Sequence, residues 1–125
     1  MTLLYVALGG ALGSVARYLM QTLIGHYSGA SFPYGTLLVN VTGSFLMGLV
    51  IGWLGRVMPA HAPELRLFLT VGILGGYTTF SSFSLDAIVL YDDDRWKAMG
   101  VYIAASVILS LAGLFAGLRL MRHLA

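Results

Sequence analysis

The sequence predicts an all-α membrane protein in which four helices cross the bilayer and the third is broken near its middle. Hydrophobic residues make up 58% of the 125 residues and charged residues only 10%, which is far more apolar than a soluble domain of this size. Turn-rich interruptions divide the chain into four apolar segments, each near the ~20 residues that cross ~30 Å of hydrocarbon. Residues 1–125 are therefore expected to form one membrane domain.

Charge and residue types exclude several classes of protein. The formal net charge of +2 is small and the basic residues are scattered, so nucleic-acid binding is not expected. The chain has no cysteine, which excludes disulfides and thiol chemistry. No nucleophile, base and orienting acid are grouped, so we expect no enzymatic activity. The N-terminus lacks a basic region before its apolar run and is expected to be a retained span.

The first span is expected at residues 3–24. Gly9 and Gly13 form a small-residue face that lets a neighbouring helix approach closely. Arg17 lies within the same apolar segment, where a charge costs about 2.5–3.5 kcal/mol on insertion scales. Its side chain either reaches the interface or lines an aqueous vestibule, and the spacing does not decide between these two positions.

The second span is expected at residues 33–54 and carries a polar stripe. Thr36, Asn40 and Ser44 recur every four residues and therefore share one helix face. The Asn40 carboxamide needs hydrogen-bond partners in hydrocarbon. It serves either in a hydrogen bond between helices or as a donor in a pore, and both uses fit the stripe.

The third span is expected at residues 65–91, with a break inside the stretch 72–84. Gly75 and Gly76 loosen the backbone, and the hydroxyls of Thr78 and Thr79 compete for its hydrogen bonds. A break frees N–H and C=O groups at membrane depth, which is tolerated only where protein or a water-filled cavity covers them. The break therefore indicates a functional site.

Two phenylalanines follow the break. Phe80 and Phe83 are three residues apart and share a face of the helix that resumes. They are either ordinary core or lipid-facing residues, or aromatic edges whose partial positive charge holds an anion. Spacing alone does not choose between the two.

Two ionisable side chains are expected near water. His61, in the connection before the third span, is predicted to be a solvated loop residue rather than a metal ligand. Asp86 is the one acid inside a predicted span, six residues before Asp92. We expect it to reach the interface, with a proton relay as the alternative.

The fourth span is expected at residues 96–120. Tyr102, Ser106 and Ser110 recur every four residues and form a track of hydroxyls on one face. The Lys and Arg residues flanking the spans favour cytoplasmic termini by a margin of only two charges, from Arg56, Arg66, Arg119 and Arg122 against Arg95 and Lys97. Either orientation in the membrane is therefore compatible with the sequence.

Three segments resemble the Fluc/CrcB family of bacterial fluoride channels. These are GTLLVNVTGS at 35–44, GGYTTFSSFS at 75–84, and the Tyr102, Ser106 and Ser110 track. The resemblance spans the chain and implies a dual-topology homodimer of antiparallel subunits in the bacterial inner membrane. It implies passive export of cytoplasmic fluoride and thus fluoride resistance.

The resemblance also implies roles for individual residues. Phe80 and Phe83 look like ring edges that meet fluoride, and Arg17 matches a vestibule residue. The backbone carbonyls of Gly75 and Thr78 match ligands of a structural sodium ion on the dimer axis. The other residues implied in the fluoride pore are polar: Asn40, Thr36, Tyr102, Ser106 and Ser110.

Two other functions stay open from the residues alone. One is a proton-coupled small multidrug exporter, although that class needs a deep carboxylate in its first span and this sequence has none there. The other is a membrane subunit that transports nothing.

Overall fold

The computed structural model describes residues 1–29, 31–57 and 62–124, and over these ranges it contains helices and no strand. Four helical segments are long and apolar enough to cross a membrane: Thr2–Ser28, Tyr34–Val57, Pro63–Asp92 and Trp96–His123. The predicted class, an all-α protein with four spans, is confirmed. The chain is a multi-pass membrane protein. His61 lies outside the described residues.

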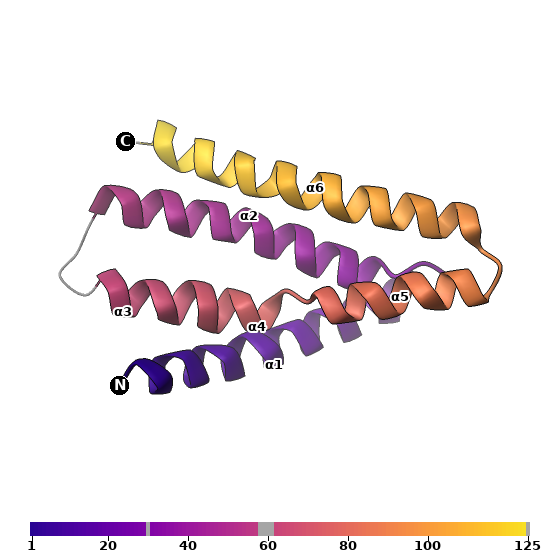
Figure 1. The fold of residues 1–125 in the computed structure, drawn as a ribbon, viewed down its shortest axis with the longest axis horizontal. Coiled ribbons are helices and arrows are strands. Elements are labelled where there is room, and N and C mark those ends of the chain that lie inside the picture. Colours follow the sequence, from indigo (N-terminus) through magenta and orange to yellow (C-terminus); the bar gives the residue numbers. More distant parts are fainter. Residues whose placement is uncertain (30, 58–61, 125) are drawn as a thin grey trace.

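The first, second and fourth spans are single helices, and the third is not (Figure 1). Helix α1 is Thr2–Ser28, α2 is Tyr34–Val57 and α6 is Trp96–His123. The third span consists of α3 (Ala62–Arg66), the π-helix η1 (Leu67–Leu74), α4 (Gly75–Tyr77) and α5 (Phe80–Asp92). The predicted interruption is confirmed. The π-helix was not predicted, because no side-chain pattern marks it.

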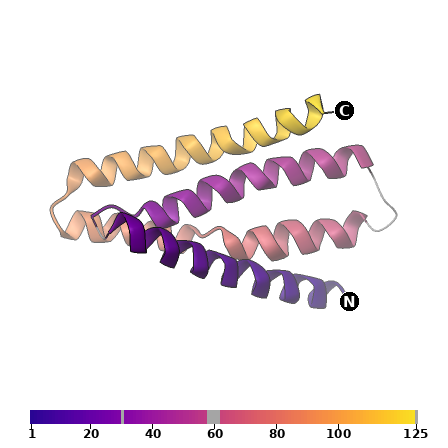
Figure 2. The same ribbon diagram turned by 180° about the vertical axis from the view of Figure 1, so that it is seen from behind.

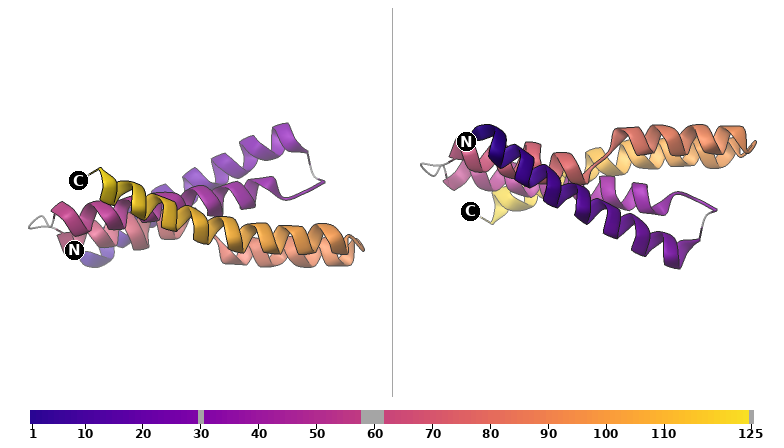
Figure 3. Two further views of the ribbon diagram at one scale, coloured as in Figure 1. Left: turned by 90° about the horizontal axis from the view of Figure 1, so that it is seen from above. Right: turned by 90° about the horizontal axis from the view of Figure 1, so that it is seen from below.

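Glycines bring the helices into direct backbone contact in two pairs. Helix α1 packs on η1 and α4, where a Cβ on Gly13 would overlap the Ile73 carbonyl and one on Gly76 would lie 2.7 Å from the Gly10 carbonyl oxygen. Helix α2 packs along α6, where a Cβ on Gly48 would overlap the Leu114 carbonyl. Figures 2 and 3 show the two pairings from behind and from the long edges of the bundle.

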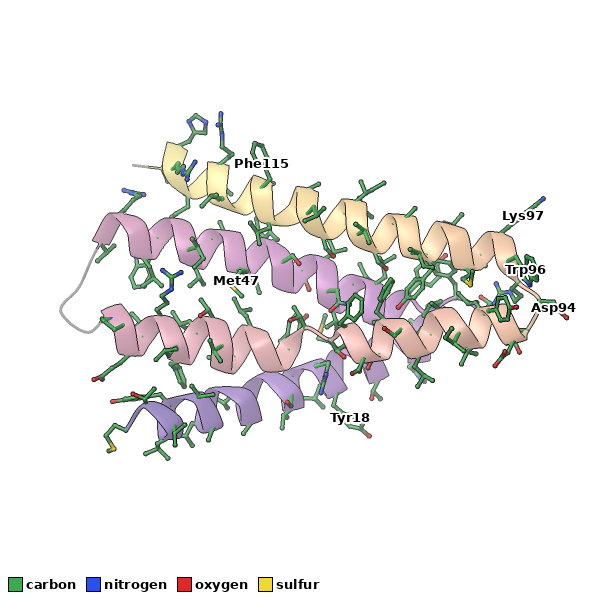
Figure 4. The ribbon with its side chains drawn as sticks, in the orientation of Figure 1. Tyr18, Met47, Asp94, Trp96, Lys97 and Phe115 are labelled. Carbon is green, nitrogen blue, oxygen red and sulfur yellow. The ribbon has the colours of Figure 1, made fainter. Side chains whose placement is uncertain are left out.

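The two ends of the bundle differ. The start of α1 and the end of α6 lie at one end, together with the end of α2 and the start of α3 (Figure 1). At the other end Asp94, Trp96 and Lys97 gather at the turn between α5 and α6 (Figure 4). Asp94 has φ 57°, and the Trp96 ring stacks on Tyr91 with centroids 5.5 Å apart.

Candidate functional site

The break in the third span consists of two extended residues. Thr78 has φ −82° and ψ 155°, and Thr79 has φ −150° and ψ 119°, after which α5 begins at Phe80. Figure 1 shows this step between α4 and α5 near the middle of the bundle. The span therefore loses its regular helical hydrogen bonds halfway across the membrane.

Asn40 holds the break from the neighbouring helix α2. Its Nδ2 donates to the Thr79 carbonyl at 3.0 Å, and its Oδ1 accepts from the Thr79 amide at 2.8 Å. One side chain thus pairs both backbone groups of the most extended residue. This hydrogen bond between helices is one of the two uses that the sequence left open, and it leaves one N–H of the carboxamide for another acceptor.

The two threonines also use their side chains locally. The Thr79 hydroxyl accepts from the Ser82 amide at 3.1 Å and so caps the N-terminus of α5. The Thr78 hydroxyl donates to the Leu74 carbonyl at 2.9 Å. A threonine before a resuming helix is a typical N-cap, so the pattern could have indicated this cap, but Thr79 was not predicted as a functional residue.

Two carbonyls lose their helical donors at the break. In a continuous α-helix the Thr79 amide would donate to Gly75 and the Ser82 amide to Thr78. Both amides donate to side-chain oxygens instead, those of Asn40 and Thr79. The carbonyl groups released in this way are the pair that the sequence resemblance linked to a cation. Gly75 is exposed in the single chain.

A cavity of about 400 Å³ lies beside the break, between α2, the third span and α6. Five of the seven predicted pore residues line it, and Met47 points into the same space in Figure 4. No charged residue is among the described residues that line it. The lining residues are Asn40, Gly43, Ser44, Met47, Thr78, Thr79, Phe80, Phe83, Ser106, Val107, Ser110, Leu111 and Leu114.

Ser106 carries an unpaired hydroxyl at this cavity. The residue is 6% exposed, and its Oγ has no hydrogen-bond partner in the described structure. Leaving a buried polar group unpaired costs about 1–3 kcal/mol. Serines in membrane helices commonly bond the carbonyl four residues earlier, but this one does not. Its hydroxyl is therefore free to serve a ligand in the cavity.

The aromatic side chains form a row that leads away from the cavity. Phe80 and Phe83 have ring centroids 5.3 Å apart, and Phe83 and Tyr102 are also 5.3 Å apart. Phe83 is 9% exposed, whereas Phe80 is 76% exposed. The two phenylalanines thus differ in this chain, because one packs in the core and the other lies on its surface.

Thr36 and Tyr102, the two remaining predicted pore residues, lie beyond the phenylalanines. The fully buried Tyr102 donates its hydroxyl to Asp86 Oδ2 at 3.0 Å. Thr36 is buried and accepts from Gln21 Nε2 at 3.1 Å. A second cavity of about 280 Å³ is lined by Gln21, Thr36 and Asp86 among others. Gln21 was not predicted, because a single glutamine near a helix end carries no signal.

Arg17 lies outside this cluster, whereas Asp86 belongs to it. Arg17 is half-buried on α1 and lines neither cavity. Asp86 is half-buried, faces Tyr102 and lines the second cavity together with Asp93 and Arg95. The position at the interface that the sequence favoured stays a prediction. The contact of Asp86 with a hydroxyl 16 residues away in the chain could not be read from spacing.

Comparisons with known proteins show the family of this chain. Residues 4–118 match the family described as "CrcB-like protein, Camphor Resistance (CrcB)". The fluoride-specific ion channel FluC of Rhodospirillum centenum is 55% identical over 120 residues, which are 96% of this chain and 94% of the relative. The protein of the same name from Rhizobium meliloti is 53% identical over 120 residues, 96% and 95% of the two chains.

A third relative, the fluoride-specific ion channel FluC of Agrobacterium fabrum, is 50% identical over 119 residues, which are 95% of this chain and 94% of that protein. The similarity to these three relatives thus covers nearly the whole chain. With the family match running from the first span to the last, this chain belongs to the CrcB-like family.

Proposed function

We propose that this chain is a fluoride-specific channel through which the anion leaves the cytoplasm passively. The relatives described above carry the name of such a channel. The observation that carries the proposal is the buried, unpartnered hydroxyl of Ser106 at the cavity beside Phe83. A neutral cavity with a free donor fits a small anion.

The chemistry of the lining suits fluoride in particular. Fluoride is strongly hydrated, so a pore must replace its water with donors and still release it. Ser106, Ser110 and the remaining N–H of Asn40 supply donors, and the edges of Phe80 and Phe83 supply partial positive charge. Because the described lining contains no charged side chain, the ion is held by partial charges and is not trapped.

The proposed route continues past the aromatic row. From the cavity, Tyr102 and Thr36 extend the polar lining toward the second cavity, and Arg17 belongs to a vestibule. Protection against fluoride follows from such a route, because the neutral acid enters cells, dissociates and leaves an anion that needs an exit. The chain then works as a channel and not as an enzyme.

The functional unit we propose is an antiparallel homodimer. Gly75 and Ser81 are exposed at the break, and Phe80 is 76% exposed. Backbone groups without partners cannot face lipid at this depth, so protein must cover them. A second copy inserted in the opposite orientation would bring the two breaks together, because both lie at mid-membrane. The weak bias of flanking charges is compatible with both orientations.

A sodium ion at the junction of the two breaks is part of this proposal. Gly75 and Thr78 fit such an ion because their carbonyls have lost their helical donors, and hard cations prefer oxygen ligands. No group of three or more His, Cys, Asp or Glu residues that could hold a metal occurs in the described part. Backbone oxygens are therefore the ligands to expect. When bound, the ion would be held by carbonyl oxygens of both subunits and would satisfy the lone pairs that have no helical donor.

The proposed function is tested by fluoride efflux from liposomes that contain the purified protein alone. We expect a fluoride electrode to record rapid release once a potassium ionophore balances the charge. Phe83→Ile is expected to lower the rate at least tenfold, because the ring edge is lost from the cavity. Phe115→Ile is the matched control, since this ring is 61% exposed on the outer face of α6 (Figure 4).

Two results would reject the function. If liposomes with folded wild-type protein release no more fluoride than empty liposomes, the protein is not a fluoride channel. If Phe83→Ile and Phe115→Ile lower the rate of fluoride efflux equally, fluoride does not pass through the cavity. Chloride-loaded liposomes tested in parallel measure selectivity between halides.

A further inference from the structure

A third cavity lies at the end of the bundle that holds both termini, and it is basic. Its volume is about 620 Å³, and three arginines line it: Arg56, Arg66 and Arg122. They come from three different elements, since Arg56 is in the last turn of α2, Arg66 ends α3 and Arg122 is in the last turn of α6. No acidic residue is among the described residues around this cavity.

The depth of these arginines matches the headgroup region of a membrane. The second span ends at Val57, the third begins at Pro63 and the fourth ends at His123. The three guanidinium groups thus belong to residues at the ends of apolar spans, where hydrocarbon gives way to phosphates and water.

Below the arginines the cavity is apolar. Ile51, Leu54 and Leu118 also line it. Ile51 precedes Arg56 by five residues and Leu118 precedes Arg122 by four, so these side chains lie about 6–8 Å deeper along their helices. A ligand that fits both levels has a phosphate at one end and hydrocarbon at the other.

One of the arginines is fixed in place. Arg56 Nη1 donates to the Met121 carbonyl at 3.0 Å, which ties the end of α2 to the end of α6. A guanidinium has five N–H donors in a planar fork, so donors remain on Arg56 for a phosphate. Gly55 also lines the cavity, and a Cβ at this position would meet nothing within 4 Å, so the α2 side is open there.

We propose that this cavity binds the headgroup of an anionic phospholipid, with an acyl chain along Ile51, Leu54 and Leu118. The three arginines bind the phosphate. The apolar residues below them favour a lipid over free phosphate, because only a lipid has an acyl chain to pack there. General attraction of basic residues to an anionic leaflet would not require three of them to line one cavity. The inference does not depend on which ion the protein conducts.

Arg119 provides a control near the same helix end. It precedes Arg122 by three residues on α6, but its guanidinium carbon lies 5.7 Å from the centre of the Phe115 ring on the outer face, and it does not line the cavity. Replacing Arg119 removes the same charge from the same helix end. A difference in lipid binding between the Arg119 and Arg122 variants is therefore due to the cavity and not to the lost charge.

The test is native mass spectrometry of the full chain in detergent, with phosphatidylglycerol or phosphatidylcholine of identical acyl chains added. We expect wild type to retain phosphatidylglycerol preferentially. Arg66→Gln and Arg122→Gln are each expected to reduce that preference roughly fivefold, and Arg119→Gln to change it less than twofold. Circular dichroism and elution volume verify that each variant is folded.

Three outcomes would overturn the proposal. Wild type that retains both lipids equally shows that no headgroup is recognised. Equal effects of Arg119→Gln and Arg122→Gln show attraction by charge alone. Complete displacement of phosphatidylglycerol by excess inorganic phosphate shows a site for the free anion.

Discussion

The carboxamide of Asn40 and the backbone of Thr79 are joined by two reciprocal hydrogen bonds, of 3.0 and 2.8 Å. A side chain on one helix thereby satisfies the two backbone groups that an extended residue exposes at the centre of another span. In hydrocarbon no water can take over this task. Asn40 thus stabilises the broken span and also lines the cavity.

Asn40→Ala is expected to destabilise the protein, because it leaves both Thr79 groups unpaired at a cost of about 1–3 kcal/mol each. The melting temperature in detergent should fall by several degrees, and fluoride efflux should fall with it. Leu38→Ala on the exposed face of the same helix is the control, since this side chain is 41% exposed. If Asn40→Ala and Leu38→Ala have the same melting temperature, Asn40 does not stabilise the break.

Ser106→Ala should separate conduction from stability. The substitution removes a buried hydroxyl that has no partner, so the melting temperature should stay constant or rise by an amount corresponding to about 1 kcal/mol. Fluoride efflux should fall at least tenfold. In the control Ser84→Ala, the lost hydroxyl donates to the Phe80 carbonyl of its own helix. Undiminished efflux in Ser106→Ala would show that the free donor does not serve the ion.

Tyr102→Phe removes one hydrogen bond and keeps the ring. Asp86 Oδ2 would lose the donor at 3.0 Å, at a cost of about 1–3 kcal/mol in free energy of unfolding. Contacts of the ring with Phe83 and Phe32, at 5.3 and 5.6 Å between centroids, remain. Chemical unfolding of Tyr102→Phe is compared with that of Tyr18→Phe, whose side chain lies outside the bundle (Figure 4). Equal stabilities would mean that the Asp86 contact contributes nothing.

Gly13→Ala and Gly10→Ala should behave in opposite ways although both lie on α1. A Cβ at position 13 would overlap the Ile73 carbonyl, whereas one at position 10 meets nothing within 4 Å. The added methyl group of Gly13→Ala must push α1 away from η1, so we expect most of the protein to be misfolded. Gly10→Ala should be neutral or stabilise the helix by up to about 1 kcal/mol. The yield of monodisperse protein after purification measures both, and similar yields would argue against the tight contact.

Removing sodium should lower stability if carbonyls at the break hold the ion. We expect the melting temperature in detergent to rise with sodium concentration and not with the same concentrations of N-methylglucamine, because a ligand of the folded state stabilises it by mass action. A melting temperature that follows ionic strength alone would exclude a specific sodium site. That result would not contradict the proposed channel function, which the efflux measurements test separately.

The sequence predicted the spans and the break because both follow from local chemistry. Long apolar segments must cross a bilayer as helices, and adjacent glycines followed by threonines disfavour a continuous helix. It did not predict that Asn40 would pair with Thr79, because the two residues are 39 positions apart. The π-helix and the burial of Phe83 but not Phe80 depend on packing between helices, which residue spacing does not determine.

The break also has an electrostatic consequence. Aligned peptide groups give the C-terminal end of a helical segment a partial negative charge and the N-terminal end a partial positive charge. The segment that ends at Tyr77 and the helix that begins at Phe80 present these opposite poles to each other, separated only by Thr78 and Thr79. One interruption of the main chain can therefore attract ions of both signs to neighbouring positions at the centre of the bilayer, without a single charged side chain.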